Sequence, residues 1–113
     1  MTYSIERVTT LIGAHRFGNT DSDIAFLLTD SRSLCFPEET LFFALKTERN
    51  DGSHYIPDLY RRGMRNFVVS VVPDDYASAY PDANFLKVES PLIALQRLAE
   101  RHREEFDIPV IGI

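Results

Sequence analysis

Two polar segments of the sequence carry side chains that could bind an anionic ligand. The first is Thr29-Asp30-Ser31-Arg32 and the second runs from Lys46 to Gly52, and each follows an apolar run. Lysine and arginine donate charge-assisted hydrogen bonds to phosphate oxygens, and arginine can do so through two nitrogens at once. This chemistry assigns phosphate contacts to Arg32, Lys46 and Arg49, and contacts with a base or sugar to Ser31, Thr47 and Asn50.

An ordinary turn explains the same residues without a ligand. Asp30 can cap the next turn and pair with Arg32, and Asp51-Gly52 is a common turn sequence. Spacing alone favours this simpler interpretation. The binding hypothesis needs a further argument, such as the position of both segments at one edge of a sheet.

The elements around these segments alternate between buried strands and amphipathic helices. Apolar runs without polar alternation predict strands that are covered on both faces, at 24–28, 41–45, 67–72, 85–88 and 109–113. Helices are expected over 5–12, between a Ser4 cap and a Gly13 stop, over 56–62 before Gly63, and from Pro91 onward. The inner stripe of the last helix is expected to be Leu92, Leu95, Leu98, Ala99 and His102. This order predicts an α/β fold, a three-layer α/β/α sandwich with a largely parallel or mixed sheet.

Composition restricts the class of protein. The 113 residues suit one domain, and a net charge of −5 argues against a nonspecific nucleic-acid binder. No run approaches the roughly 18 apolar residues of a membrane span, no secretory signal is visible, and Cys35 is the only cysteine. A cytoplasmic protein without a membrane or nucleic-acid partner is expected. His15 and His102 have no partner cluster at metal spacing, so no metal site is expected.

The sequence contains no nucleoside-triphosphate loop. Gly13 and Gly18 have the spacing of the two loop glycines, but Asn19 stands where the lysine must be. The expected strand at 109–113 is of the kind that commonly leads into such a loop. We therefore expect no catalytic residue and no ATP binding in residues 1–113, with the chemistry of a larger enzyme lying downstream.

The order of motifs resembles the N-terminal domain of the Mur ligase family. The matching residues are Leu28-Thr29-Asp30-Ser31-Arg32, Pro37, Leu41-Phe42-Phe43-Ala44-Leu45-Lys46, Arg49-Asn50-Asp51-Gly52 and Tyr55-Ile56, followed by a tail over 94–113. Two departures are Thr47 in place of a usual glycine and Ser53, with His54 one place later, in place of a usual histidine. Either could change how the loop meets a nucleotide.

The resemblance implies a specific substrate and specific contacts. Residues 1–113 would be the domain that binds UDP-N-acetylmuramoyl-tripeptide, with the uridine diphosphate held by Ser31, Arg32, Lys46, Thr47, Arg49, Asn50 and Asp51. The tail is similar to the branch that adds D-alanyl-D-alanine in peptidoglycan precursor synthesis. The parent enzyme would use ATP and magnesium in a downstream domain of the same chain, and pyridoxal phosphate if it were fused to an alanine racemase. The alternatives are the ligase that adds the third amino acid, and a regulatory or interaction module of the same fold.

Overall fold

A six-stranded sheet forms the centre of the molecule. The computed structural model describes residues 3–29, 36–46, 51–105 and 110–111. Within these residues the strands lie in the order β2 (His15–Phe17), β7 (Asn84–Lys87), β6 (Asn66–Val69), β5 (Thr40–Phe43), β4 (Phe26–Leu28) and β8 (Val110–Ile111). All neighbours are parallel except β2, which pairs antiparallel with β7. The sheet is therefore mixed and largely parallel, as the sequence predicts.

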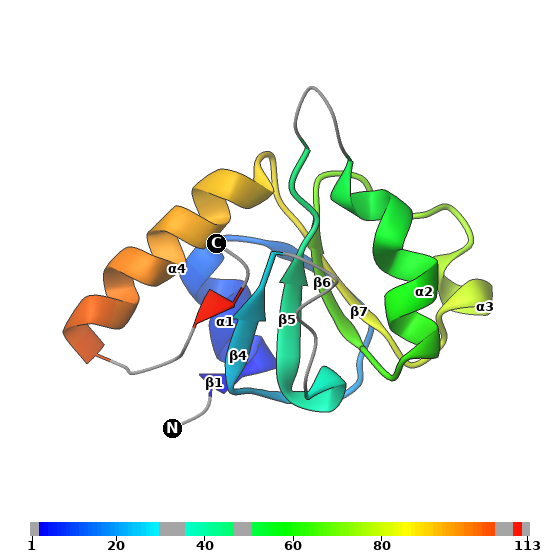
Figure 1. The fold of residues 1–113 in the computed structure, drawn as a ribbon, viewed down its shortest axis with the longest axis horizontal. Helices are drawn as coiled ribbons and strands as arrows, with labels where there is room; N and C mark the ends of the chain where they lie inside the picture. The colour runs from blue at the N-terminus through cyan, green and yellow to red at the C-terminus, as the bar shows by residue number, and fades with distance from the viewer. Residues whose placement is uncertain (1–2, 30–35, 47–50, 106–109, 112–113) are drawn as a thin grey trace.

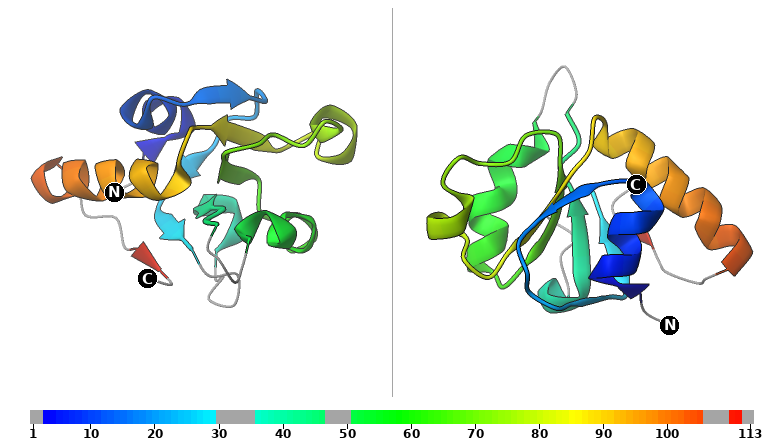
Figure 2. Two further views of the ribbon diagram at one scale, coloured as in Figure 1. Left: turned by 90° about the horizontal axis from the view of Figure 1, so that it is seen from above. Right: turned by 180° about the vertical axis from the view of Figure 1, so that it is seen from behind.

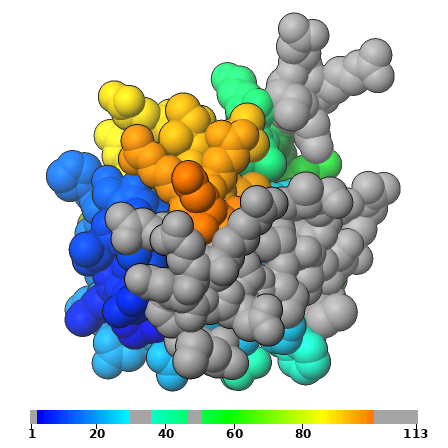
Figure 3. Space-filling model, turned by 90° about the vertical axis from the view of Figure 1, so that its left-hand side faces the viewer, coloured from blue at the N-terminus to red at the C-terminus, as the bar shows by residue number. Residues whose placement is uncertain are grey.

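Helices cover both faces of this sheet. Helices α1 (Ile5–Ile12) and α4 (Pro91–Glu105) lie together on one face, and α2 (Ile56–Arg61) and the short α3 (Tyr76–Ala79) lie on the other side (Figures 1 and 2). Figure 3 shows the first turns of α4 directly against α1 on the surface. Two 3₁₀ turns, η2 (Pro37–Glu39) and η3 (Gly52–Tyr55), and a small antiparallel pair of β1 (Tyr3–Ser4) with β3 (Asp23–Ile24) complete the described fold. The expected three-layer α/β/α arrangement is confirmed.

The apolar strands supply two hydrophobic cores because successive side chains of a strand point to opposite faces. The core beneath α1 and α4 takes Leu27, Leu41, Phe43, Val68 and Leu86 from the sheet. The core beneath α2 takes Leu28, Phe42, Phe67, Val69 and Phe85. This division explains why the strands contain no regular polar alternation.

Helix α1 begins and ends where the sequence predicts. The Oγ of Ser4 accepts a hydrogen bond of 3.2 Å from the amide of Arg7, which satisfies one of the free donors of the first turn. Gly13 ends the helix with a φ of 65°, a left-handed conformation that glycine adopts without a Cβ penalty. Ile5, Val8 and Ile12 form the buried side of the helix.

We expect Ser4→Ala to lower the free energy of unfolding by about 0.5–2 kcal/mol, the usual cost of losing a capping side chain. Chemical denaturation followed by circular dichroism measures the change. Ser4→Asp is the matched control, because aspartate also caps a helix and adds a favourable charge at its N-terminus. Equal losses in the two variants would contradict the capping role.

Several strand boundaries differ from those expected, including β7, which spans Asn84–Lys87 instead of 85–88. The run 24–28 is divided at Ala25, so that Ile24 belongs to β3 and residues 26–28 form β4 in the large sheet. The amide of Ala25 donates to the carbonyl of Glu39 at 2.8 Å, which redirects the chain between the two sheets. Strands β5 and β6 end at Phe43 and Val69 rather than at 45 and 72. Both apolar runs continue past the last paired residue because their ends line loops instead of the sheet.

The predicted inner stripe of α4 is wrong at Leu92. Leu92 and Ile93 are each 50% exposed, whereas Ala94, Leu95 and Leu98 are buried against α1 and the sheet. The side chain of His102 lies outside the described residues. Strand β2 was not predicted from the sequence, since a three-residue strand carrying His15 and Arg16 has no apolar pattern.

The expected final strand is present over Val110–Ile111, where β8 pairs in parallel with β4. Positions 109, 112 and 113 lie outside the described residues. Within the described ranges, no helix combines the length and the apolar character needed to cross a bilayer.

Candidate functional site

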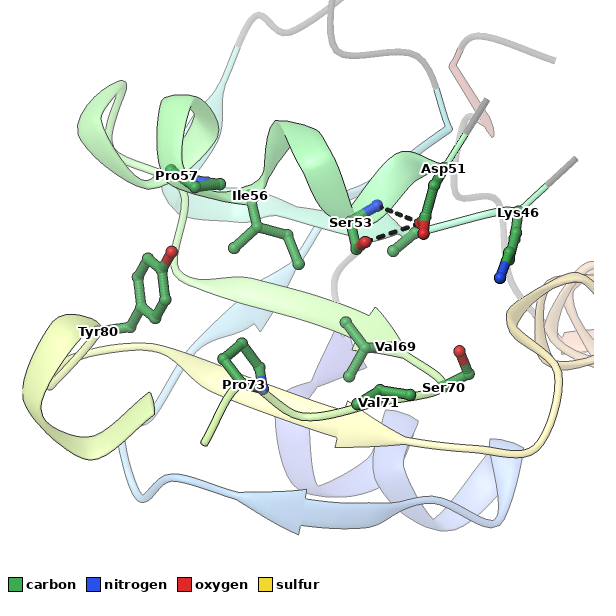
Figure 4. Close-up of a pocket in the computed structure, with 11 residues that line it drawn as sticks. Lys46, Asp51, Ser53, Ile56, Pro57, Val69, Ser70, Val71, Pro73 and Tyr80 are labelled. Atoms are coloured by element: carbon green, nitrogen blue, oxygen red, sulfur yellow. Dashed lines mark hydrogen bonds between the residues drawn. The ribbon is translucent and has the colours of Figure 1, made fainter. Parts of the chain in front are cut away.

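A pocket of about 320 Å³ opens at the carboxyl ends of β5 and β6 (Figure 4). Ligands bind at this edge in open α/β sheets because the loops that follow parallel strands meet there. The volume is within the range of small-molecule sites. The pocket is lined by Ala44, Lys46, Asp51, Ser53, Ile56, Pro57, Val69, Ser70, Val71, Pro73 and Tyr80.

The loop after β5 returns close to its own starting point. Lys46 and Asp51 form an isolated antiparallel bridge, and the amide of Gly52 donates to the carbonyl of Leu45 at 2.8 Å. A Cβ on Gly52 would lie 2.9 Å from both the Cα of Ala44 and the nitrogen of Leu45. Only glycine fits this approach of backbone to backbone. The predicted turn at Asp51-Gly52 therefore brings Asp51 beside Lys46.

Asp51 fixes the start of η3. One of its carboxylate oxygens accepts hydrogen bonds from the amide of Ser53 at 3.0 Å and from the Ser53 hydroxyl at 2.7 Å. These two bonds, first the hydroxyl and then the amide, lower the pKa of Asp51 below its ordinary value of 3.8. The nearby charges of His54 and Lys46 act in the same direction, and burial opposes them. Asp51 is thus the charged N-cap of η3, the turn that carries Ser53 into the wall of the pocket.

The stability that Asp51 contributes is expected to be lost in acid. Because its pKa is lowered in the folded state, the contribution is fully present above pH 3.8 and disappears as the pH falls through the lowered value. The melting temperatures of the protein and of Asp51→Asn should therefore differ near neutral pH and converge in acid. Ser53→Ala removes the hydroxyl that is the largest cause of the shift, so it should reduce this pH dependence. A constant difference between the protein and Asp51→Asn across the titration would contradict this role.

The pocket has a polar end and an apolar end. Figure 4 shows Lys46, Asp51 and Ser53 toward one end, with Ser70 on the opposite wall at the close of β6. Pro57 and Tyr80 lie at the other end, and Pro73 faces them across the pocket. Lys46 is exposed, so its ammonium group is available to a ligand. This arrangement suits a molecule with one anionic end and one flat apolar end.

Two of the predicted contact residues, Lys46 and Asp51, lie together in this pocket. The other five fall outside the described residues, and their positions stay predictions: Ser31, Arg32, Thr47, Arg49 and Asn50. The pocket includes side chains that the sequence analysis did not select, notably Ser70, Pro73 and Tyr80. Ser70 could have been found from the rule that selected Lys46, because it also follows a covered strand directly. Tyr80 follows α3, and nothing in its spacing connects it with the loop after β5.

The described residues show no grouping of three or more histidine, cysteine, aspartate or glutamate side chains suited to a metal ion. The polar side chains around the pocket are one lysine, one aspartate and two serines, besides the tyrosine hydroxyl. These groups donate and accept hydrogen bonds and supply charge. The pocket is therefore equipped to offer charge and hydrogen bonds to a ligand.

Comparison with known proteins agrees with this architecture. Residues 23–103 match the family model described as "Mur ligase family, catalytic domain". A UDP-N-acetylmuramoyl-tripeptide--D-alanyl-D-alanine ligase from Synechocystis sp. is 36% identical over 99 residues, which are 84% of this chain and 20% of that protein.

Solved structures show the same fold. A UDP-N-acetylmuramoylalanyl-D-glutamyl-2,6-diaminopimelate--D-alanyl-D-alanyl ligase from Acinetobacter baumannii aligns with a TM-score of 0.74 at 22% identity, over 93% of this chain and 22% of that one. A crystal structure of MurF from the same organism aligns with a TM-score of 0.73 at 23% identity, with the same coverage. The chain thus spans about a fifth of the length of these proteins. The matched family model and the 36% identical relative show that the chain belongs to the Mur ligase family.

Proposed function

We propose that this chain is the substrate-recognition part of a peptidoglycan-precursor ligase and that it binds the uridine diphosphate end of UDP-N-acetylmuramoyl-tripeptide. The observation that carries the proposal is the pocket at the carboxyl ends of β5 and β6, which Lys46 lines together with the hydroxyl groups of Ser53 and Ser70. The name of the Synechocystis relative supplies the class of substrate. Its D-alanyl-D-alanine specificity is the one we propose for the whole protein.

In this proposal the residues of the pocket bind and orient the substrate rather than react with it. The ammonium group of Lys46 neutralises phosphate charge, and the hydroxyls of Ser53 and Ser70 offer hydrogen bonds to the ribose or the phosphates. Asp51 holds the wall that carries Ser53 in place through the two bonds described above. Arg32 and Arg49 are proposed to add further charge from the two predicted binding segments.

The ligation chemistry is proposed to lie in the part of the protein that these 113 residues do not include. The sequence has no Gly-x-x-x-x-Gly-Lys-Ser/Thr run, and a triphosphate needs that nest of backbone amides together with the lysine. ATP and magnesium would therefore be bound by a downstream domain. A cytoplasmic location follows from the same proposal, since ATP and nucleotide-activated precursors are cytoplasmic substrates.

Direct titration of the purified chain with UDP tests the proposal. We expect Lys46→Gln to weaken UDP binding about tenfold, because one charge-assisted hydrogen bond contributes about 1.5 kcal/mol at an exposed position. Lys87→Gln is the matched control, since Lys87 is exposed but does not line the pocket. If the affinity for UDP is unchanged in Lys46→Gln, the phosphates do not bind in this pocket. If the protein does not bind UDP at all, the proposed function is wrong.

Three finer hypotheses from the sequence stay predictions. One is addition of the third amino acid instead of D-alanyl-D-alanine, which activity assays of the full-length protein with both amine substrates distinguish. Another is fusion to an alanine racemase that uses pyridoxal phosphate, which the complete coding sequence decides. The third is a regulatory or interaction module without ligand binding, and the UDP titration excludes it if binding is saturable.

A further inference from the structure

A second pocket, of about 340 Å³, shares only Tyr80 with the pocket at the carboxyl ends of β5 and β6. One wall is the loop after β2, at Gly18 and Asn19, and the other is formed by Tyr76, Tyr80 and Pro81 in and after α3. It is open to solvent at the end of the molecule where α3 lies (Figure 1). We call it the α3 pocket, a candidate binding site separate from the one proposed for UDP.

The two tyrosine rings of the α3 pocket are held in place by the core. The ring of Tyr76 packs edge-to-face on Phe17, with centroids 5.6 Å apart, and on Phe85, with centroids 6.3 Å apart. The ring of Tyr80 packs edge-to-face on Phe85 at 5.5 Å. Both tyrosines are half-buried, so part of each ring packs inward while another part lines the pocket. Rings held in this way lose little conformational freedom when a ligand binds.

The loop that forms the other wall is fastened to the sheet. The carbonyl of Thr20 accepts hydrogen bonds from the Nδ2 of Asn84 at 2.7 Å and from the Nη2 of Arg16 at 2.8 Å. Arg16 also donates to the Oδ1 of Asn84 at 3.3 Å and lies 3.9 Å from a carboxylate oxygen of Glu6, and it does not line the pocket. Both walls of the α3 pocket are therefore in position before a ligand binds.

The segments around the α3 pocket carry charge of one sign. Residues 18–22 and 73–83 contain four aspartates and no lysine, arginine or histidine. These aspartates are all exposed: Asp21, Asp74, Asp75 and Asp82. Burial, and after it the negative charge of Asp75, raises the pKa of Tyr80 above its ordinary value of 10.0, so this charge acts on the wall of the pocket. A surface of this kind attracts cations and repels anions.

The same group of tyrosines already holds one cation. The guanidinium carbon of Arg65 lies 4.2 Å from the centre of the Tyr60 ring, and that ring packs edge-to-face on Tyr80 at 5.0 Å. A guanidinium group is planar, stacks on aromatic rings and donates hydrogen bonds to carboxylates. The α3 pocket offers a guanidinium group both kinds of contact, through its tyrosine rings and through the aspartates around it.

We propose that the α3 pocket is a docking site for an arginine side chain carried by a basic segment of a partner protein. Charge complementarity identifies the partner as basic, and the rings of Tyr76 and Tyr80 favour arginine over lysine. The open position of the pocket lets a side chain on another protein reach it. The inference goes beyond UDP binding and does not depend on it, since the two pockets have only Tyr80 in common.

Calorimetric titration with three capped peptides, tetra-arginine, tetra-lysine and tetra-glutamate, tests the proposal. Low ionic strength is used because salt screens exposed charges. We expect tetra-arginine to bind saturably at one site and more tightly than tetra-lysine, and tetra-glutamate not to bind. In solution NMR, tetra-arginine should shift the amide signals of Asn19, Ala77 and Ala83, which line the pocket.

Two sets of variants separate the aromatic contact from the charge. We expect Tyr76→Leu to weaken tetra-arginine binding about two- to fivefold, the usual value of an exposed cation–π contact, whereas Tyr76→Phe keeps the ring and the affinity. The double variant Asp75→Asn and Asp82→Asn should weaken binding about three- to tenfold, through the loss of two exposed charges. Glu100→Gln is the matched control, since Glu100 is an exposed acid of α4, on the other face of the sheet.

The outcomes that would overturn the inference are specific. If Glu100→Gln weakens binding as much as the double aspartate variant, or if tetra-lysine binds as well as tetra-arginine, the attraction is that of net charge alone. If tetra-arginine does not bind, or shifts only amides outside the α3 pocket, the pocket is not a docking site for arginine. If Tyr76→Leu fails to fold, the double aspartate variant decides, because both side chains are exposed and Asp75 makes no capping hydrogen bond to α3.

Discussion

Phe67→Ala is expected to lower the free energy of unfolding by about 3–5 kcal/mol, the usual cost of deleting a large buried aromatic side chain. Phe67 is fully buried in β6, which has neighbouring strands on both sides. Its ring stacks on Phe85, with centroids 5.3 Å apart, and meets Phe42 edge-to-face at 6.4 Å. Truncation leaves a cavity in the core beneath α2. Since small domains are stable by only about 5–15 kcal/mol, much of the chain's stability would be lost.

Urea denaturation followed by circular dichroism measures this loss. Phe36→Ala is the control, because Phe36 is 55% exposed and its ring stacks on that of Phe26, the first residue of β4, with centroids 5.2 Å apart. We expect a cost of about 1 kcal/mol or less there. Similar costs for the two variants would mean that the ring of Phe67 does not lie in a closed core.

Gly52→Ala is expected to damage both the stability of the domain and the binding pocket. The added Cβ would approach backbone atoms of Ala44 and Leu45 to 2.9 Å, and backbone cannot move aside as a flexible side chain does. Overpacking of this kind costs about 1–3 kcal/mol. The loop must then move away from β5, which separates Asp51 from Lys46 and breaks the bond from Gly52 to Leu45. We therefore expect UDP binding to fall more in this variant than in Lys46→Gln.

Gly13→Ala separates the two ways in which a glycine can be required. A Cβ at Gly13 meets nothing within 4 Å, so that variant loses only the left-handed conformation, at a cost of about 1–2 kcal/mol. It should keep the pocket and the affinity for UDP. Calorimetric titration of both variants checks the pair, and full UDP affinity in Gly52→Ala would show that the close approach does not shape the site.

The sequence by itself determined most of the helices and the covered strands of the sheet. A helix between Ser4 and Gly13 follows from local chemistry, since the capping hydroxyl and the left-handed residue act within one turn. The apolar runs around Leu41 and Phe67 required strands covered on both faces, which in turn required helices on both sides of the sheet. Lys46 and Asp51 were found because residues that follow such strands gather at one edge.

The tertiary structure decided which face of a helix is buried, to which sheet a strand belongs and which loops line the pocket. Leu92 has the spacing of a buried residue, but it is 50% exposed, and the contacts of α4 with the core are made by Ala94, Leu95 and Leu98. The apolar run 24–28 carries no local signal of a break at Ala25, and the pairing of Ile24 with Tyr3 and of Phe26 with Thr40 shows where the chain passes from one sheet to the other. Tyr80 lies 34 positions from Lys46 along the chain, yet both residues line the same pocket. They meet there because α2 and α3 lie on the same side of the sheet. Local spacing determines elements because its interactions are local, whereas a pocket depends on contacts between segments whose separation along the chain carries no signal.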